Sequence, residues 1–315
     1  MRPETRIGVV GATGAVGSVT RSLLAERGYE NVRLFASARS AGRMVPYGQR
    51  EVEVEEATPD ALGAGELDVC FFSVGATASR ELVPQAVRGG TVAIDKSSAW
   101  RMEPDVPLVV PEVNPDRAFE HEGVLAVANC STIPLVCVLK PLHDAAGLAR
   151  VRVATYQSVS GKGAEAVERL RGEAPTDHDL RADWDFDGEE YDEETKIREE
   201  TRKIIELPRL PVSATCVRVP IMVGHSEAVW LETEEPLPAE QARRLLSHAP
   251  GVRVVDAPSP ARAAGTDEVL VGRIRRDRAG DGNALSLFLS CDNLRKGAAL
   301  NALQIADLLS AAVAA

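Results

Sequence analysis

Cys130 is the residue of this sequence best suited to nucleophilic catalysis. It follows the apolar run 124–128 and precedes two hydroxyl residues that can begin a helix, with Pro134 in the first turn. The positive end of a helix lowers the pKa of a nearby thiol and stabilises the thiolate, which is the nucleophilic form. Cys70 and Cys137 instead lie inside apolar runs, as small buried residues do. The pattern predicts covalent catalysis by Cys130 at the carboxyl edge of a parallel sheet, where ligands bind.

A glycine-rich loop near the N-terminus predicts a dinucleotide site. Its sequence, GVVGATGAVG at residues 8–17, follows an apolar strand pattern and leads into a helical one. Glycines there allow a tight turn and bring backbone N–H groups at the helix N-terminus close to a pyrophosphate. The residues expected to contact the cofactor are Gly11, Thr13, Gly14, Ala15 and Val16.

The loop after the second expected strand indicates that the cofactor is NADP. An acidic residue there would bind the ribose 2'-hydroxyl of NAD, but this chain has Ser37, Arg39 and Ser40 instead. A guanidinium between two hydroxyls suits a 2'-phosphate, because Arg presents a planar set of donors to phosphate oxygens. The alternative is that Arg39 is a solvated loop cation.

Residue patterns that other chemistries need are absent from the sequence. The common reductases with this glycine loop use a Tyr with a Lys four residues later. No tyrosine of the chain has that partner: Tyr29, Tyr47, Tyr156 and Tyr191. The cysteines show no CxxC pair and no Cys/His cluster at zinc-ligand spacing, so no metal is expected. The acidic run DWDFDGEEYDEE at 183–194 is interpreted as a solvated loop before a helix, in preference to a metal site.

The spacing of apolar residues predicts two domains. Up to residue 130, short apolar runs alternate with helical patterns, which is typical of βαβ units in a Rossmann-type, doubly wound parallel sheet of the α/β class. The expected strands are 6–10, 32–36, 67–74, 91–94 and 124–128, with helices at 16–27 and 77–87. Beyond residue 150, longer alternating strands indicate an α+β domain with a mixed sheet, at 151–159, 215–219, 228–232, 269–274 and 285–290. A last helical pattern at 294–314 is expected to pack on the first domain, so the predicted domains are 1–132 with 293–315, and 133–292.

Composition limits the partners of this protein. The chain has 315 residues, 44% hydrophobic and 26% charged, with a formal net charge of -11, as in an ordinary globular enzyme. A negative field repels nucleic acid and anionic lipid, so neither is an expected partner, although a local group of cations can still hold a phosphorylated ligand. The sequence shows no cleavable signal and no apolar stretch of membrane-spanning length, and a cytoplasmic location is expected.

The longer motifs resemble those of the aspartate-semialdehyde dehydrogenase family over nearly the whole chain. They are GATGAVG (11–17), ASARSAG (36–42), PLVVPEVN (107–114), NCST (129–132), TYQSVSGKG (155–163), VSATCVRVP (212–220), GHSE (224–227), VGRIR (271–275) and DNLRKGAALNALQIA (292–306). The resemblance implies a Rossmann domain and a substrate and dimerisation domain like that of glyceraldehyde-3-phosphate dehydrogenase, assembled as a homodimer or a dimer of dimers. It also implies that NADPH reduces 4-phospho-L-aspartate to aspartate 4-semialdehyde and phosphate, in lysine, diaminopimelate, methionine and threonine biosynthesis.

The same resemblance implies roles for individual residues. The catalytic set comprises the acyl-accepting thiol, the general acid/base and a substrate-orienting amide, at Cys130, His225 and Gln157 respectively. The substrate contacts fall on Arg218 for the carboxylate, on Glu200 for the ammonium, and on Lys203, Arg101 and Asn129 for the phosphate. Further cofactor contacts are implied at Ser160, Gly161 and Asn293. The remaining histidines are interpreted as surface residues: His121, His143, His178 and His248.

Two departures from the family pattern leave other functions open. The region 172–194 is shorter and more acidic than usual, and Lys96 stands where Asn is more common. One alternative is the same chemistry on another acyl phosphate, such as N-acetylglutamyl phosphate, whose acetylated nitrogen carries no charge for Glu200 to pair. Another is a non-catalytic nucleotide-binding paralogue, which the complete catalytic set disfavours. Glu200 and Lys203, three residues apart, could also form an exposed helical ion pair instead of binding substrate.

Overall fold

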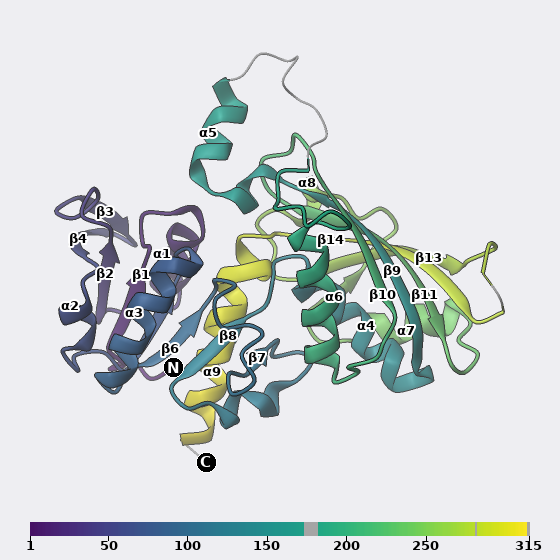
Figure 1. Cartoon of the computed structure of the whole chain (residues 1–315), viewed down its shortest axis with the longest axis horizontal. Helices are drawn as coiled ribbons and strands as arrows, with labels where there is room; N and C mark the ends of the chain where they lie inside the picture. The colour runs from purple at the N-terminus through teal and green to yellow at the C-terminus, as the bar shows by residue number, and fades with distance from the viewer. Residues whose placement is uncertain (173–181, 281, 314–315) are drawn as a thin grey trace. The chain divides into compact units, whose positions relative to one another are not determined.

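The computed structural model of the chain describes residues 1–172, 182–280 and 282–313 (Figure 1). They form two compact units. Unit 1 comprises Met1–Ala128 and Ala298–Ala315, and unit 2 comprises Asn129–Gly297. The sequence pattern put the corresponding boundaries after residues 132 and 292. Within the described parts of the chain, no helix combines the length and apolar composition needed to cross a bilayer.

Unit 1 is built on a Rossmann-type sheet with the strand order β3-β4-β2-β1-β5-β6-β8-β7. Its strands are β1 Ile7–Val10, β2 Val32–Ala36, β3 Met44–Tyr47, β4 Arg50–Glu56, β5 Val69–Phe72, β6 Val92–Asp95, β7 Leu108–Val109 and β8 Val124–Val127. All neighbours pair in parallel except β3, which is antiparallel to β4. Every residue of β1 and β5 is buried, as expected for central strands that are covered on both faces.

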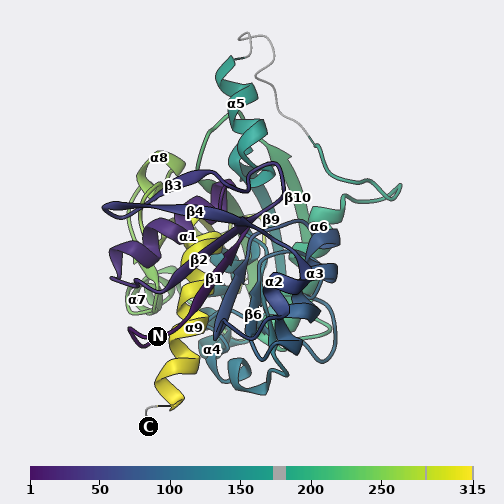
Figure 2. The same cartoon turned by 90° about the vertical axis from the view of Figure 1, so that its left-hand side faces the viewer.

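Helices cover both faces of this sheet. Figure 2 shows α1 and α9 on one side of the strands and α2 and α3 on the other, and each of these two helix pairs is in contact. The helices of unit 1 are α1 Ala15–Glu26, α2 Pro59–Gly63, α3 Ala76–Arg88, α9 Leu300–Val313 and the 3-10 helix η1 Pro115–Glu120. The α9 helix is joined to the region around β7, because Asn301 Nδ2 donates to Val109 O at 3.1 Å. The predicted doubly wound architecture is therefore confirmed.

Unit 2 contains a mixed sheet with the strand order β10-β9-β11-β14-β13-β12. The strands are β9 Leu148–Gln157, β10 Val212–Arg218, β11 His225–Thr233, β12 Val252–Val254, β13 Val269–Arg276 and β14 Ala284–Cys291. The β9–β10 pair is parallel, whereas β11 is antiparallel to both β9 and β14. The predicted α+β character of this region is confirmed.

The helices of unit 2 pack on one face of that sheet. Those on this face are α4 Thr132–Ala146, α6 Asp192–Ile205 and α7 Ala239–Ser247. The unit also contains α5 Ala164–Gly172, α8 Pro260–Ala263, which contacts β14, the 3-10 helix η2 Val159–Lys162 and a π-helical turn, η4 Arg295–Ala299, where the chain passes into unit 1. On the other face, Tyr156 and Trp230 remain 38% and 37% exposed. One face of the sheet thus carries the core of unit 2, and the other face is open in the single chain.

Two sequence-based boundaries were wrong. The last helix was expected from residue 294, but α9 begins at Leu300 because residues 295–299 form the π-helical turn. The acidic run 183–194 was expected to be a loop throughout, but α6 already begins at Asp192. Carboxylates in a first helical turn are stabilised by the helix dipole, so the acidic composition there favours the helix start.

Candidate active site

The thiol of Cys130 and the imidazole of His225 form the centre of the site in unit 2. Cys130 Sγ lies 3.2 Å from His225 Nε2. Cys130 directly precedes Ser131, the N-cap of α4, and Asn129 Oδ1 accepts the backbone N–H of Ser131 at 2.8 Å. All five cysteines are among the described residues, and only Cys130 is half-buried while the others are buried. Cys130 is therefore the thiol that a reactant can reach.

His225 is a buried, neutral hydrogen-bond donor to this thiol. It is the first residue of β11, and its Nδ1 accepts the backbone N–H of Ser158 at 3.0 Å. Burial, followed by the positive charge of Arg218, lowers the pKa of His225 to about 3. Because Nδ1 is an acceptor, the single proton of the neutral imidazole is assigned to Nε2, which faces Cys130. The arrangement suits stabilisation of a negative sulfur atom.

The β9–β10 register brings two further predicted residues together. Gln157 and Arg218 end these strands and are direct partners in the parallel pairing. Gln157 Oε1 accepts from Thr155 Oγ1 at 3.0 Å, and its Nε2 donates to Glu193 Oε1 at 2.9 Å. The amide of Gln157 is thus held in one orientation, next to the guanidinium of Arg218.

Arg218 is a buried cation with a defined orientation. Its Nη1 donates to Ser158 O at 3.0 Å, and its Nη2 lies 3.2 Å from Asp183 Oδ1. The guanidinium also lies over the ring of Trp184, 4.5 Å from the centroid. A Cβ atom on Gly161 would come within 3.3 Å of both Arg218 Nη1 and His225 Nε2, so the glycine leaves these groups approachable.

Helix α6 contributes a buried carboxylate that sequence reasoning missed. The predicted Glu200 accepts the backbone N–H of Asn129 at 2.6 Å through Oε2. Glu193, seven residues earlier, accepts Asn129 Nδ2 at 2.9 Å as well as Gln157 Nε2. The spacing of the two glutamates places them on one face of the helix and was the available signal. Lys203, one turn beyond Glu200, is half-buried.

Asn293 connects the loops on either side of His225. Its Oδ1 accepts the backbone N–H of Gly224 at 2.8 Å and Ser158 Oγ at 3.0 Å, and its Nδ2 donates to Ser160 Oγ at 3.0 Å. All three polar partners lie within unit 2 and Asn293 itself is buried. The structure thus shows a supporting role for Asn293, and the cofactor contacts of Asn293, Ser160 and Gly161 stay predictions.

The glycine-rich loop of unit 1 has the shape that a nucleotide phosphate requires. Gly11 adopts φ +79°, and a Cβ there would lie 2.3 Å from Ser73 O. A Cβ on Gly17 would lie 2.1 Å from Gly11 O, so neither position can carry a side chain. Helix α1 begins after Gly14 with no side-chain cap and no acidic residue in its first turn, which includes Ala15 and Val16. Its N-terminal amides can therefore receive an anion.

The residues predicted to bind a 2'-phosphate cluster after β2. Ser37 and Arg39 are exposed and Ser40 is half-buried, and the backbone N–H of Ser40 donates to Ser37 O at 2.8 Å. This turn holds the two hydroxyls and the guanidinium within one short loop. The 2'-phosphate contacts of Ser37, Arg39 and Ser40 stay predictions.

Arg101 and Lys96 belong to unit 1. Arg101 is buried and donates from Nε to Val127 O at 2.9 Å and from Nη2 to Lys96 O at 2.8 Å. Burial lowers the pKa of Lys96 to about 8, and its Nζ lies 3.4 Å from Thr20 Oγ1. The side chain of Lys96 therefore packs beneath α1, and the phosphate contact of Arg101 stays a prediction.

The other predicted surface histidines have ordinary settings where the structure describes them. His121 Nδ1 accepts from Gly123 N, His143 Nδ1 accepts from Leu148 N, and His248 is exposed. His178 lies outside the described residues.

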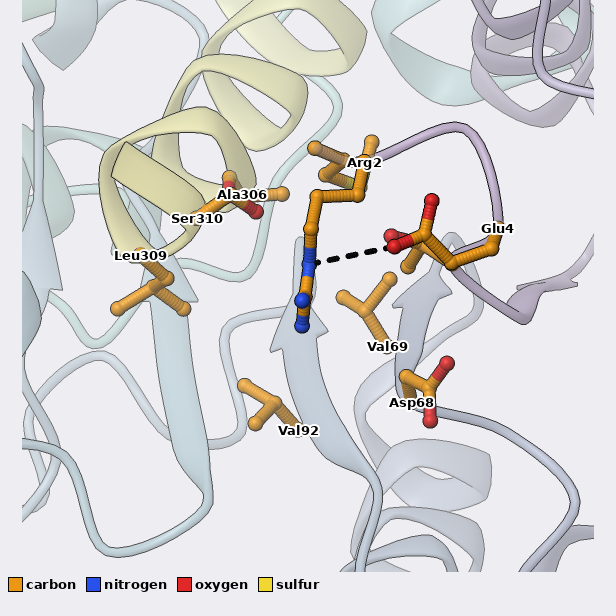
Figure 3. Close-up of a pocket in the computed structure, with 10 residues that line it drawn as sticks. Arg2, Glu4, Asp68, Val69, Val92, Ala306, Leu309 and Ser310 are labelled. Atoms are coloured by element: carbon orange, nitrogen blue, oxygen red, sulfur yellow. Dashed lines mark hydrogen bonds and ion pairs between the residues drawn. The ribbon is translucent and has the colours of Figure 1, made fainter. Parts of the chain in front are cut away.

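A small cavity of about 190 Å³ lies at the amino edge of the unit 1 sheet (Figure 3). Arg2 and Glu4 form an exposed ion pair of 3.7 Å beside it, and Leu309 and Ser310 of α9 complete the wall. Open α/β sheets bind ligands at the opposite, carboxyl edge, so this cavity is separate from the nucleotide loop.

Comparison with known families identifies both halves of the chain. Residues 6–121 match the family model described as semialdehyde dehydrogenase, NAD binding domain. Residues 139–185 and 181–296 match the model of the semialdehyde dehydrogenase dimerisation domain.

Curated relatives match over nearly their full length. An aspartate-semialdehyde dehydrogenase of Corynebacterium melassecola is 45% identical over 343 residues, which covers 97% of this chain and 99% of the relative. One from Aquifex aeolicus is 43% identical, with 96% and 97% covered.

Solved structures share the fold. Aspartate semialdehyde dehydrogenase II from Vibrio cholerae has a TM-score of 0.90 at 37% identity, covering 97% of this chain and 98% of that one. A second structure of that enzyme, complexed with ASA, has the same TM-score and identity, covering 96% and 97%. The Candida albicans enzyme, solved with NADP, has a TM-score of 0.78 at 26% identity, covering 97% and 98%.

Proposed function

The chain belongs to the aspartate-semialdehyde dehydrogenase family, and we propose that it reduces 4-phospho-L-aspartate with NADPH through a thioester on Cys130. The observation that carries this proposal is the 3.2 Å contact between Cys130 Sγ and His225 Nε2. The product is aspartate 4-semialdehyde, a precursor of lysine, diaminopimelate, methionine and threonine. The complete catalytic set argues against a non-catalytic paralogue.

In the proposed reaction the Cys130 thiolate attacks the carbonyl carbon of the acyl phosphate. A C–S bond forms, the bond from carbon to the phosphate oxygen breaks, and the electron pair leaves with inorganic phosphate. When bound, NADPH supplies the hydride that reduces the resulting thioester. Collapse of the reduced adduct re-forms a C=O bond and expels the thiolate, so Cys130 is regenerated.

His225 provides the acid half of the predicted acid–base role. Its Nε2–H can donate a hydrogen bond first to the thiolate and then to the oxyanion of the reduced adduct, because both negative charges develop beside Cys130. The backbone N–H of Ser158 at Nδ1 keeps this tautomer. The low pKa of about 3 supports a neutral donor near pH 7.

Two charged residues select the substrate in this proposal. Arg218 binds the α-carboxylate, because a guanidinium offers two parallel donors to a carboxylate. Glu200 binds the α-ammonium, and its complete burial strengthens an interaction with a cation. Gln157 orients the reacting carbonyl from the neighbouring position in the sheet. An N-acetylated substrate has no ammonium group for Glu200 to bind. The Glu200 carboxylate therefore favours a substrate with a free amino group.

NADP is the proposed cofactor. The loop with Gly11 and Gly14 would hold its pyrophosphate, and Ser37, Arg39 and Ser40 would hold its 2'-phosphate. The uncapped start of α1 supports a dinucleotide, and the exposed guanidinium of Arg39 supports NADP over NAD. The Candida albicans relative with NADP is a further support.

A homodimer, or a dimer of dimers, is the proposed assembly. The open face of the unit 2 sheet exposes the aromatic residues Tyr156 and Trp230, and the Tyr156 ring lies 6.2 Å from that of Phe288. Aromatic residues are enriched in interfaces between proteins. Analytical ultracentrifugation tests this proposal, and a strictly monomeric protein would contradict it.

The decisive experiment has two arms. In the first, NADP reduction is followed with aspartate 4-semialdehyde, with and without phosphate; we expect turnover only when phosphate is present. In the second, the protein is treated with 4-phospho-L-aspartate without cofactor and its mass is measured. An added aspartyl group on wild-type protein, absent from Cys130→Ala, supports the thioester. Phosphate-independent turnover, or an adduct that persists in Cys130→Ala, contradicts the proposal.

A further inference from the structure

The carboxylate-binding edge of Arg218 is already occupied by a residue of the same chain. Asp183 Oδ1 lies 3.2 Å from Nη2 and 3.3 Å from Nε of Arg218. The other terminal nitrogen of Arg218, Nη1, donates to the backbone carbonyl of Ser158. The Nε–Nη2 edge is one of the edges that bind carboxylates in proteins. In the absence of substrate, Asp183 therefore takes the place where a substrate carboxylate would bind.

Other contacts hold Asp183 in this position. Lys162 Nζ lies 2.9 Å from Asp183 Oδ2, so each carboxylate oxygen faces a different cation. Trp184, the next residue, stacks on the guanidinium of Arg218 at 4.5 Å. Burial alone would raise the pKa of Asp183, but the hydrogen bond from Lys162 and the charge of Arg218 outweigh it and lower the pKa. Asp183 is consequently a carboxylate at neutral pH.

The two sides of this ion pair differ in exposure. The side chain of Arg218 is 7% exposed, whereas those of Asp183 and Lys162 are 24% and 52% exposed. The sheet and the Ser158 carbonyl hold Arg218 in place, whereas Asp183 and Lys162 lie on the solvent side of the ion pair. Displacement of Asp183 would then leave the guanidinium available in its present orientation.

We infer that Asp183 lowers the affinity for substrate by competing with the substrate carboxylate for Arg218. The inference rests on the proposed role of Arg218 in binding substrate. A ligand with a carboxylate replaces one ion pair with another, whereas a ligand without one leaves Asp183 in place. The apparent affinity for substrate is reduced by the fraction of molecules in which Asp183 occupies the guanidinium.

Kinetics of Asp183→Asn test the competition. The neutral amide pairs weakly with Arg218, so KM for aspartate 4-semialdehyde should fall by at least about threefold with kcat little changed. Asp183→Glu keeps the charge and should retain a KM closer to wild type. Asp185→Asn is the matched control, because it removes the same charge from an exposed side chain two residues further on. It should leave KM unchanged.

A substrate analogue separates competition from a general effect on the site. 3-Aminopropanal has the aldehyde and ammonium groups of the substrate but no carboxylate. Its kcat/KM should be the same in wild type and Asp183→Asn. An unchanged or increased KM for aspartate 4-semialdehyde in Asp183→Asn, or an equal gain for 3-aminopropanal, overturns the inference.

Binding of L-aspartate gives a readout that does not depend on turnover. Calorimetric titration should show at least about threefold tighter binding to Asp183→Asn than to wild type. Titration of wild type should also change tryptophan fluorescence, and Trp184→Phe should lose that change because Trp184 leaves Arg218 when Asp183 does. Equal affinities in the two proteins contradict the competition. If wild type lacks phosphate-dependent activity, the proposed function fails, yet this titration still tests Asp183.

Discussion

Cys130 Sγ and His225 Nε2 lie 3.2 Å apart although 95 positions of sequence separate the two residues. Ser158 donates its backbone N–H to the far side of the imidazole, so the histidine presents its proton to sulfur. The neutral imidazole can therefore stabilise a thiolate by a hydrogen bond, and a positively charged imidazolium is not needed.

Replacement of Cys130 by Ala should abolish turnover and leave NADP affinity near wild type, because only the nucleophile is removed. Cys130→Ser should keep at most a trace, since an alkoxide is far harder to form than a thiolate near pH 7. Phosphate-dependent NADP reduction and a fluorescence titration with NADP measure the two properties. Cys70→Ala, at a fully buried thiol in unit 1, is the control and should stay active. Substantial turnover by Cys130→Ala would refute covalent catalysis.

Arg39→Ala should weaken NADP binding by about 1 to 3 kcal/mol, the range of a lost charge-assisted contact, with little effect on NAD. The exposed Arg43, four residues later, provides the control, and Arg43→Ala should bind both cofactors as wild type does. Calorimetry with each cofactor makes the comparison. Equal losses for NADP and NAD would show that Arg39 supports the loop and does not contact a 2'-phosphate.

Glu200→Gln should reduce kcat/KM for aspartate 4-semialdehyde at least tenfold, about 1.4 kcal/mol, because it removes the charge that pairs the ammonium. Alkylation of Cys130 by iodoacetamide should proceed at the wild-type rate, since the thiol and His225 are untouched. Arg218→Lys should also lower kcat/KM, because an ammonium cannot reproduce the paired donors of a guanidinium. An unchanged kcat/KM in Glu200→Gln would show that Glu200 does not bind the substrate ammonium. The argument against an N-acetylated substrate would then fail.

Buried His225 should make the fold sensitive to acid. Its native pKa is about 3, whereas an unfolded histidine titrates near 6.5, so below pH 6.5 the unfolded state binds the extra proton. The free energy of unfolding should therefore decrease as pH falls, and His225 should account for about 2 kcal/mol between pH 6 and 4.5. Urea unfolding of His225→Gln should show a smaller decrease than wild type. His248→Gln, at an exposed position, should show the wild-type decrease. An identical pH dependence in all three proteins would contradict the assignment.

Glu227 should have the opposite pH dependence. It is fully buried in β11, both carboxylate oxygens lack a hydrogen-bond partner among the described residues, and burial raises its pKa well above 4.5. The native state keeps a proton that the unfolded chain loses, so Glu227 destabilises the fold as pH rises above about 4.5. Urea unfolding should find that Glu227→Gln gains stability relative to wild type between pH 5 and 8. Glu235→Gln, at an exposed position, should gain no stability. An equal gain in Glu235→Gln would show that the change in net charge is the cause.

Features that depend on local sequence pattern could be predicted without the structure. The alternation of apolar runs predicted the parallel sheet of unit 1, because a central strand buried on both faces must be apolar throughout. The glycine-rich loop could also be predicted, because a side chain at Gly11 or Gly17 would collide with nearby backbone. Cys130 was distinguishable from the other cysteines by its polar neighbours and the helix that follows it.

Which of these residues come into contact depends on how the strands and helices pack. Gln157 stands beside Arg218 because β9 and β10 pair in one register, and a shift of β10 by one residue would turn Arg218 to the opposite face of the sheet from Gln157. Glu193 was missed because its partners, Asn129 and Gln157, come from segments distant in sequence. The acidic segment that was predicted to be a solvated loop places Asp183 against Arg218. Such contacts follow from strand register and helix packing, which short-range sequence patterns do not encode.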